Sequence, residues 1–251
     1  MNLVDVFNIK NKDIITIVGA GGKTSLMFSA SSLLRKDYKV LVTTTTNIYV
    51  PDSRTVKFDK LCLINNDEEL DSILKNDKNG IYVIGSKIID NSNKPKLKGL
   101  TFEMLDKISP FFDILLIEGD GSKEKPLKGW IDSEPVVYDK TTKTIGVIDI
   151  NSIGLEINED NIHRLDNFLN IVSDNKSSKV NVNHLKNITL NKNGLFKLSK
   201  GEKILFINKS EGIINKTNAN LLIKKIKDEN SSYIDKFVYG SLINNEFFTL
   251  D

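Results

Sequence analysis

The chain has 251 residues, 39% of them hydrophobic and 27% charged, which predicts a globular fold with at least one sizeable core. Its formal net charge of +2 argues against nucleic acid or a membrane surface as a required partner. The single cysteine, Cys62, excludes an intramolecular disulfide framework, and its apolar neighbours predict a buried thiol. There is no visible secretory signal and no apolar run near the ~20 residues that span a bilayer, so we expect a cytoplasmic protein.

A glycine-rich motif follows the first predicted strand, at 14–18, and precedes a predicted helix. Its residues are Gly19, Ala20, Gly21, Gly22, Lys23, Thr24 and Ser25. Glycines let backbone N–H groups converge on an anion, and the start of a helix adds partial positive charge. We therefore predict a phosphate-binding loop, in which Lys23 contacts the phosphates of ATP or GTP and Thr24 ligates Mg²⁺. The alternative is a glycine turn with a purely structural role.

The motif is shorter than the usual G-x-x-x-x-G-K-[ST] pattern, because Ile17 stands where that pattern has its first glycine. It also differs from the dinucleotide fingerprint G-x-G-x-x-G, since Thr24 stands at the position of the last glycine. This second difference disfavours a nicotinamide-dependent oxidoreductase.

The residues after the motif predict a βαβ unit. The helix, which ends near 36–37, has an apolar face made of Leu26, Met27, Ala30, Leu33 and Leu34. A strand at 40–42 follows, parallel to the first and joined to it by a right-handed crossover. Four threonines come next, at 43–46. High β-propensity is one explanation for them, and contact of Thr44 and Thr45 with Mg²⁺ or a phosphate at the carboxyl end of the sheet is the other.

Strands and helices continue to alternate along the rest of the chain, which is typical of an α/β protein with a mostly parallel sheet. We expect a loop at 51–60, a strand at 61–64, a helix at 67–75 with Asp67 as its N-cap, a strand at 80–89, a turn at 91–95 and a helix at 101–108. Later strands are expected at 144–150, 203–207 and 237–239, and a helix-like segment at 158–169.

Two carboxylates lie at the end of the apolar strand predicted at 113–117. Glu118 follows the strand directly, and Asp120 stands between two glycines. Burying an unpaired charge is costly, so acids at such a strand end usually belong to a site or have a partner. We predict that Glu118 holds Mg²⁺ and that Asp120 positions water or substrate; the alternative is a turn in which Asp120 binds backbone N–H groups. Lys125 and Lys128 follow as candidates to bind a second, anionic substrate, although most surface lysines are only solvated.

A third candidate segment follows the strand at 203–207. Asn208, Lys209 and Glu211 look like the N-K-x-D element with which GTP-binding proteins read guanine, with Glu211 in place of the usual aspartate. The alternative is an ordinary strand end in which Ser210 caps the next helix. That helix has a predicted apolar face of Ala219, Leu222, Ile223 and Ile226.

Together these motifs resemble the YqeC family over nearly the whole chain. The matching segments are G-A-G-G-K-T at 19–24, L-V-T-T-T-T at 41–46, L-K-G-L at 97–100, E-G-D-G-S at 118–122, P-L-K at 126–128, E-P-V-V at 134–137, His163-Arg164 and Asn208-Lys209. Gly129-Trp130 and Asp149 depart from the family's usual residues. The resemblance implies an accessory factor in selenium cofactor biosynthesis, linked to selenium-dependent molybdenum hydroxylases.

More distantly, the glycine motif with Glu118 is similar to the Mur ligases, and the order of the motifs is similar to the GTPases that deliver nickel to metalloenzymes. Both relatives are P-loop proteins that use Mg²⁺ and a nucleoside triphosphate. They imply a P-loop NTPase-like three-layer sandwich with a mostly parallel central sheet. We expect one nucleotide-binding domain over residues 1–251, with a small insertion around 122–200.

Two functional hypotheses follow. In the first, the protein is a Mg²⁺-dependent ATP or GTP hydrolase, or a phosphoryl or nucleotidyl transferase, with Lys23, Glu118 and Asp120 as catalytic residues. In the second, it is a nucleotide-gated chaperone that delivers a selenium or molybdenum cofactor to a partner enzyme. Two histidines and one cysteine are too few for the cluster of a metal carrier, but a selenium or molybdopterin cargo requires no such cluster.

Overall fold

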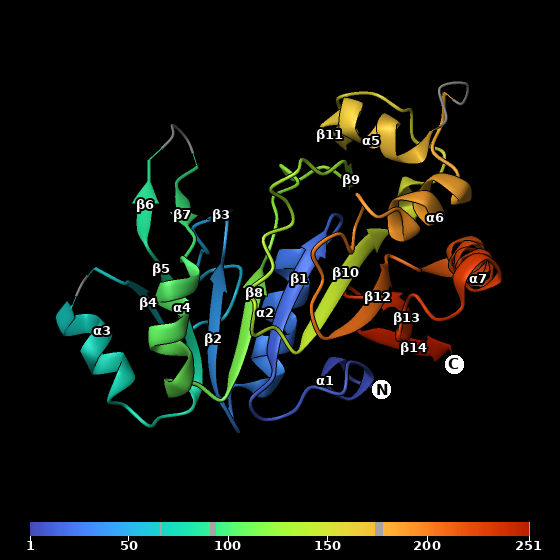
Figure 1. The fold of residues 1–251 in the computed structure, drawn as a ribbon. Helices are drawn as coiled ribbons and strands as arrows, with labels where there is room; N and C mark the ends of the chain where they lie inside the picture. The colour runs from blue at the N-terminus through green and yellow to red at the C-terminus, as the bar shows by residue number, and fades with distance from the viewer. Residues whose placement is uncertain (66, 91–93, 174–177, 251) are drawn as a thin grey trace.

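In a computed structural model, the chain folds around one nine-stranded sheet (Figure 1). The structure describes residues 1–65, 67–90, 94–173 and 178–250. The strand order is β14-β13-β12-β10-β1-β8-β2-β5-β4, and among these described strands only β14 is antiparallel to its neighbour. The strands are β1 Ile14–Gly19, β2 Lys39–Thr44, β4 Lys60–Leu63, β5 Gly80–Gly85, β8 Ile114–Glu118, β10 Lys143–Asp149, β12 Glu202–Asn208, β13 Lys236–Ser241 and β14 Glu246–Leu250. The prediction of a mostly parallel sheet is confirmed.

The position of β8 brings its acidic end beside the glycine motif. β8 lies between β1 and β2, and in this register Glu118 is opposite Ile17 on β1 and Thr44 on β2. The central strands are buried on both faces, which is why their sequences are continuous apolar runs. Because these strands are parallel, their carboxyl ends meet at one edge of the sheet, where ligands bind in open α/β folds.

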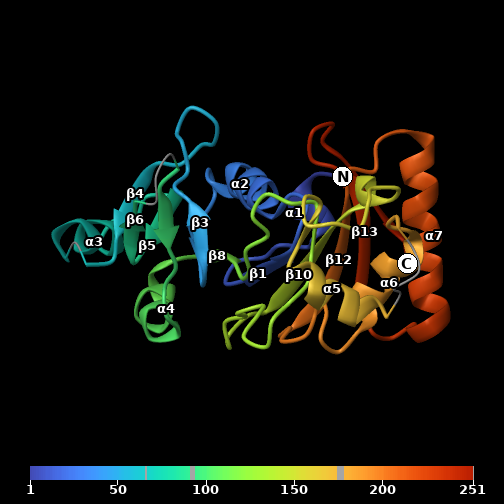
Figure 2. The same cartoon turned by 90° about the horizontal axis from the view of Figure 1, so that it is seen from above.

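Helices cover both faces of the sheet and complete three layers, as seen from above in Figure 2. On one face, α1 (Leu3–Val6) and α2 (Lys23–Leu34) pack against the sheet through one shared core. On the other face, α3 (Asp67–Leu74) and α4 (Phe102–Ile108) cover one half of the sheet, and α5 (Leu165–Val172), α6 (Val182–Leu190) and α7 (Gly212–Asn230) cover the other half. The architecture is consistent with the expected P-loop NTPase-like sandwich.

Two small sheets stand beyond the carboxyl edge of the central sheet (Figure 1). One has the order β3-β7-β6, and the other pairs β11 with β9. Their strands are β3 Asn47–Tyr49, β6 Lys87–Ile89, β7 Lys96–Lys98, β9 Leu127–Lys128 and β11 Ile162–His163, and two 3₁₀ turns span Ser109–Phe111 and Ile150–Ser152. The two small sheets form walls above the strand ends and so enclose a site there, whereas the 3₁₀ turn Ser109–Phe111 comes before the start of β8, at the opposite edge.

Two predicted elements are wrong. The strand expected at 80–89 is divided, because β5 ends at Gly85 and β6 belongs to a different sheet. The helix-like segment at 158–169 contains the short strand β11 before α5 begins at Leu165. Arg164 separates the two with a φ of 60°, a left-handed conformation that neither a strand nor a helix continues.

Several smaller differences also have local causes. Leu33 is 44% exposed, so it does not belong to the buried face of α2. Helix α6 is a further difference: Asn181 and His184 form a capping box at its start, with histidine where the usual sequence signature has Glu or Gln. The edge strand β14 was also not expected. Part of the predicted turn at 91–95 lies outside the described residues, as does the side chain of Asp67, on which its predicted capping role depends.

The segment 122–200, expected to include an insertion, contributes β10 to the central sheet, while its β9, β11, α5 and α6 lie outside that sheet. The expectation of a single domain stays a prediction. No helix in the described part of the chain is long and apolar enough to cross a membrane.

Candidate functional site

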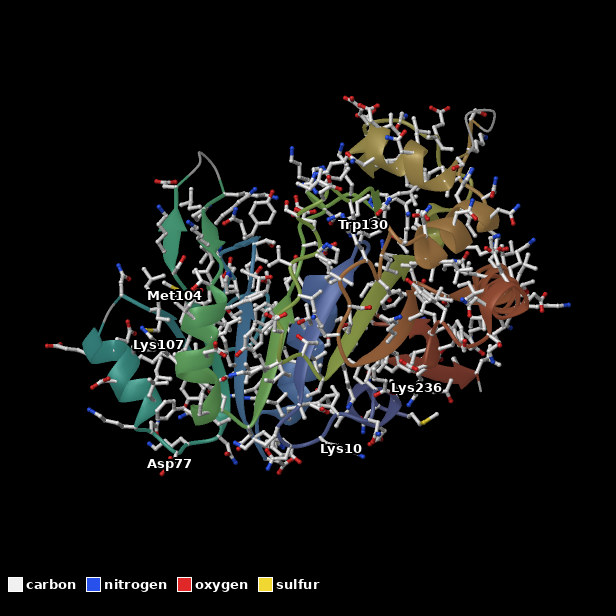
Figure 3. All side chains as sticks on the ribbon, viewed as in Figure 1. Lys10, Asp77, Met104, Lys107, Trp130 and Lys236 are labelled. Carbon is white, nitrogen blue, oxygen red and sulfur yellow. The ribbon has the colours of Figure 1, made fainter. Side chains whose placement is uncertain are left out.

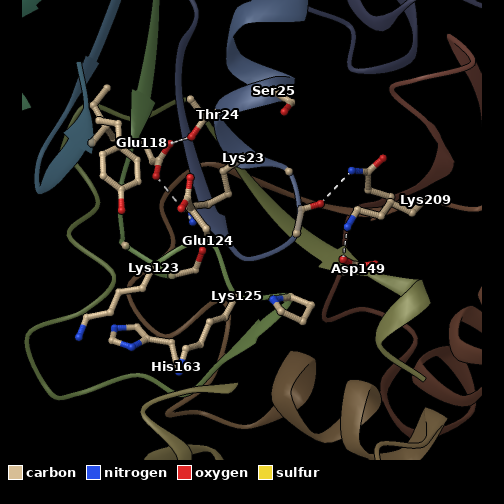
Figure 4. Close-up of a pocket in the computed structure, with 18 of the residues that line it drawn as sticks. Lys23, Thr24, Ser25, Glu118, Lys123, Glu124, Lys125, Asp149, His163 and Lys209 are labelled. Carbon is tan, nitrogen blue, oxygen red and sulfur yellow. Dashed lines mark hydrogen bonds and ion pairs between the residues drawn. The ribbon is translucent and has the colours of Figure 1, made fainter. Parts of the chain in front are cut away.

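A cavity of about 880 Å³ opens at the carboxyl edge of the central sheet (Figure 4). Its walls come from the glycine loop (residues 19–22), the start of α2, β3, the end of β8, the segment 121–126 and the residues that follow β10 and β12. Small-molecule sites in proteins typically measure about 300–1,000 Å³, so the cavity is large enough for a nucleotide.

The glycine loop packs against two strand ends so closely that side chains have no room there. Gly19, Gly21 and Gly22 have φ angles of +102°, +82° and +132°, which L-residues rarely adopt. A Cβ on Gly19 would lie 2.3 Å from the carbonyl oxygen of Val147 on β10, and a Cβ on Gly22 would lie 2.4 Å from the amide nitrogen of Asn208 on β12. The tertiary packing therefore requires these glycines, as a backbone-lined ligand site would.

Helix α2 begins directly after this loop. Gly22 is its N-cap, and no side chain of the described residues caps it. The N–H groups of the first turn, which have no partner within a helix, are therefore available to an anion. Lys23 is buried and folds back over the loop, since its ammonium donates to the carbonyl of Gly19 at 2.7 Å. The same ammonium lies 3.7 Å from Glu118 and 3.5 Å from Asp120.

Thr24 and Glu118 bring two oxygen donors together on the cavity wall. The hydroxyl of Thr24 donates to Oε2 of Glu118 at 2.7 Å (Figure 4). Burial raises the pKa of Glu118, although Lys23 and the hydrogen bond from Thr24 act in the other direction. Mg²⁺ is usually held by one or two carboxylates with phosphate oxygens and water, so this pair suits it. Within the described residues, no group of three or more His, Cys, Asp and Glu side chains forms a metal cluster.

Asp120 lies behind the glycine loop and does not line the cavity. Its carboxylate accepts hydrogen bonds from the N–H of Gly19 at 3.0 and 3.1 Å and from the indole of Trp130 at 2.8 Å, and it pairs with Lys128 at 3.0 Å. Burial acts to raise the pKa of Asp120, but Lys128 and Lys23 hold it below its ordinary value. This geometry favours the alternative interpretation, in which Asp120 anchors backbone N–H groups, over the positioning of water or substrate.

Thr44 and Thr45 also support the framework. The hydroxyl of Thr44 donates to the carbonyl of Glu118 at 2.7 Å, and that of Thr45 donates to the carbonyl of Val136 at 2.6 Å. Thr44 is the last residue of β2 and is fully buried. Thr46, the last of the four threonines, lines the cavity. Thr44 therefore supports the backbone that positions Glu118, and Thr45 supports the neighbouring segment at Val136.

The two lysines expected to bind a second substrate occupy different environments. Lys125 lines the cavity, and its ammonium donates to the main-chain carbonyl of Glu159. Lys128 is completely buried and pairs with Asp120 at 3.0 Å and with Glu134 at 2.8 Å. Lys125 thus has access to a ligand, whereas Lys128 links two acids inside the wall.

Glu134 and Arg164 form an ion pair on the cavity wall that was not anticipated. The guanidinium of Arg164 binds both carboxylate oxygens of Glu134, a two-point geometry that fixes orientation. Burial acts to raise the pKa of Glu134, but Arg164 and Lys128 hold it below its ordinary value. A continuous network therefore runs from Arg164 through Glu134, Lys128 and Asp120 to Gly19. Glu134 and Arg164 occur in the E-P-V-V and His-Arg segments of the sequence. No local sequence pattern, however, indicates that two positions 30 residues apart form an ion pair.

The predicted base-reading residues reach the cavity from the end of β12. Asn208 donates from its amide to the carbonyl of Gly21 at 2.9 Å, so this side chain supports the glycine loop. The ammonium of Lys209 lies 2.5 Å from the carboxylate of Asp149, at the end of β10. Burial raises the pKa of Asp149, although Lys209 opposes this. Asn208, Lys209, Asp149 and Glu211 all line the cavity.

Glu211 has a position that suits a ligand-binding acid. It is the N-cap of α7, and one of its carboxylate oxygens accepts a hydrogen bond from Ser241 at the end of β13. Ser210 does not cap the helix, because its hydroxyl donates to the carbonyl of Ile207 instead. The alternative in which Ser210 caps α7 is therefore wrong.

Two comparisons with known proteins agree with these motifs. The sequence pattern of the family described as YqeC protein matches residues 15–166. The chain is also similar to a protein of Escherichia coli (strain K12) named "Uncharacterized protein YqeC", with 30% identity over 213 residues, which cover 82% of this chain and 80% of that protein. The family match includes the glycine loop, Glu118, Glu134 and Arg164.

Proposed function

The chain belongs to the YqeC family, and we propose that it binds a Mg²⁺–nucleoside triphosphate, ATP or GTP, at the glycine loop. The main support is the hydrogen bond between Thr24 and Glu118 beside the uncapped start of α2, inside the cavity. Helix starts attract phosphate, and a hydroxyl beside a carboxylate attracts Mg²⁺. The start of α2 therefore suits both the phosphates and the Mg²⁺ of the nucleotide.

In this proposal, the loop N–H groups and Lys23 bind the β- and γ-phosphates. The ammonium of Lys23 leaves the carbonyl of Gly19 and binds a phosphate oxygen, because a hydrogen bond to a charged oxygen is stronger. Thr24 and Glu118 hold Mg²⁺, which neutralises charge on the phosphates. Asp120 keeps the N–H of Gly19 in place during this exchange. Rate enhancement then comes from positioning and charge neutralisation.

We assign the nucleotide base to the part of the cavity lined by Lys209 and Glu211. Leu242 and Ile243, in the turn after β13, line the same cavity and supply apolar surface for a ring. Lys125 is assigned to a second, anionic substrate. The proposed reaction is hydrolysis of the nucleotide or transfer of a phosphoryl or nucleotidyl group. We extend the proposal to a role in the maturation of selenium-dependent molybdenum hydroxylases, which is what the family resemblance implies.

The test is a titration of Mg²⁺–ATP and Mg²⁺–GTP by calorimetry and by fluorescence. Trp130 is the single tryptophan and contacts Asp120, so its emission reports on the glycine loop. Lys23→Ala is expected to weaken binding by about tenfold or more, because a charged phosphate contact is lost. Lys36→Ala is the matched control, since Lys36 is exposed just beyond the other end of α2. Equal affinity of the wild type and Lys23→Ala would refute the assignment.

One observation favours the second hypothesis, a nucleotide-gated chaperone. Ile213, Ile214 and Ile243 are 85%, 77% and 86% exposed, and Ile243 lines the cavity. Apolar side chains exposed to this degree beside a ligand site suit contact with a protein partner. Nucleotide turnover that rises many-fold with a small anionic substrate supports the enzyme. Turnover that rises only with a molybdenum hydroxylase partner supports the chaperone.

A further inference from the structure

A second cavity, of about 390 Å³, adjoins the first. The residues that line both are Lys123, Lys125, His163 and Arg164. Three are cations and one is an imidazole, and no acid of the described chain lines both cavities. Figure 4 shows Lys123, His163 and Lys125 on the wall across from Thr24 and Glu118. The junction of the two cavities, formed by these four residues, is therefore cationic.

The positive charge of this junction is incompletely compensated. In the described part of the chain, Lys123 has no ion-pair partner, and Lys125 donates to the main-chain carbonyl of Glu159 instead of a carboxylate. Glu124, which lies between the two lysines in sequence, pairs with Lys94 at 3.3 Å. Two ammonium groups therefore face the junction without a carboxylate of their own.

His163 lies in the same environment and lines both cavities. Burial lowers the pKa of His163 to about 4, and the charges of Arg164, Lys128 and Lys123 add to this effect against the opposing charge of Glu134. The imidazole is therefore neutral at pH 7 and offers one hydrogen-bond donor and one acceptor.

The rest of the second cavity has a different character. Its other walls are lined by Glu159, Asp166 and Asn167 and by the apolar Ile131, Ile162 and Leu165. Carboxylate and amide oxygens accept hydrogen bonds, so this part suits hydroxyl or amino groups. A volume of 390 Å³ is near the lower end of ligand sites and restricts the occupant to a small molecule.

We propose that the second cavity binds a small co-substrate that has a phosphate or carboxylate at one end and hydroxyl or amino groups at the other. The anionic end lies at the junction, against Lys123 and Lys125, and the hydroxyl or amino groups face Glu159 and Asp166. This inference rests on the proposed function, because it takes the first cavity as the nucleotide site. The sequence predicts Lys125 and Lys128 as the lysines that bind the second substrate. In this inference Lys123 and Lys125 bind it, and the buried Lys128 does not.

Inorganic phosphate is the probe for the anionic end, and calorimetry at saturating Mg²⁺–nucleotide measures its binding. The wild type is expected to bind phosphate beside the nucleotide, and the double variant Lys123→Gln/Lys125→Gln to bind it about tenfold or more weakly. The control is Lys10→Gln/Lys36→Gln, with the same charge change at exposed positions. Figure 3 shows Lys10 at the end of the molecule opposite Trp130. No phosphate binding beside the nucleotide, or equal binding by the double variant and wild type, would overturn the inference.

The design separates this inference from the proposed function. If Mg²⁺–nucleotide does not bind, the proposed function fails, and phosphate is titrated into the nucleotide-free protein instead. The second site then stands on its own if Lys23→Ala retains phosphate binding while the Lys123→Gln/Lys125→Gln variant loses it. Loss of phosphate binding in Lys23→Ala with retention in the double variant would place the anion at the glycine loop and refute the second site.

Discussion

Gly19→Ala tests the claim that the glycine loop is shaped by close packing against β10. A Cβ at this position would lie 2.3 Å from the carbonyl oxygen and 3.1 Å from the nitrogen of Val147. Val147 belongs to a strand that is paired on both sides, by β1 and β12, so its backbone cannot move away. The φ of +102° adds conformational strain for any residue with a Cβ.

The cost can be estimated from these two effects. Left-handed backbone costs a non-glycine residue about 1–2 kcal/mol, and overpacking a tight site costs about 1–3 kcal/mol, so Gly19→Ala is expected to lose roughly 2–5 kcal/mol of unfolding free energy. Urea unfolding followed by circular dichroism measures this as a fall of about 1–2 M in the midpoint. Mg²⁺–nucleotide affinity is expected to fall as well, since the loop must shift.

Gly121→Ala is the matched control. No atom lies within 4 Å of a Cβ built on Gly121, and its φ is outside the left-handed region. This substitution is expected to change the unfolding free energy by less than about 0.5 kcal/mol. Equal urea midpoints for Gly19→Ala and Gly121→Ala would refute the packing argument.

Three further predictions concern titratable groups. Burial raises the pKa of Glu118, so its protonated form is favoured in the fold and its contribution to stability is lost as the pH rises through the raised pKa. Glu118→Gln should therefore gain stability relative to the wild type as pH rises in urea unfolding, while losing Mg²⁺ affinity; a growing deficit would contradict this. His163 has a pKa of about 4, so its imidazole proton shifts in NMR should stay constant from pH 8 to 5. Because the fold favours the neutral imidazole, the contribution of His163 to the unfolding free energy should fall as the pH decreases from 6.5 toward 4. Burial raises the pKa of Cys62 to about 11, so native protein should resist a thiol reagent that labels it in urea; rapid native labelling would disprove this.

Local sequence patterns were sufficient for most of the framework. Apolar runs at 14–18 and 114–117 indicated buried parallel strands, because strands covered on both faces are continuously apolar. The apolar spacing of Ala219, Leu222, Ile223 and Ile226 likewise indicated the buried face of α7, and all four are buried. These predictions succeeded because they depend on neighbours within one element.

The elements that failed depend on single residues or on distant partners. β5 ends at Gly85, which packs closely against the side chain of Leu97 on β7, and β6 then leaves the central sheet and pairs with β7. The left-handed conformation of Arg164 replaces part of an expected helix with β11. The spacing of hydrophobic residues shows neither the end of β5 nor the conformation of Arg164, because each depends on contacts with another segment.

The sequence by itself determined the chemical groups of the candidate site and their order along the chain: a glycine loop, Lys23-Thr24, Glu118 with Asp120, and Asn208-Lys209 with Glu211. Only the tertiary structure decided which of these groups face the cavity. Asp120 and Lys128 turn into the wall, where each neutralises the other, whereas Glu118, Lys125 and Glu211 line the cavity. The physical reason is that a charge removed from water must find an opposite charge or hydrogen bonds, and folding brings those partners from distant segments.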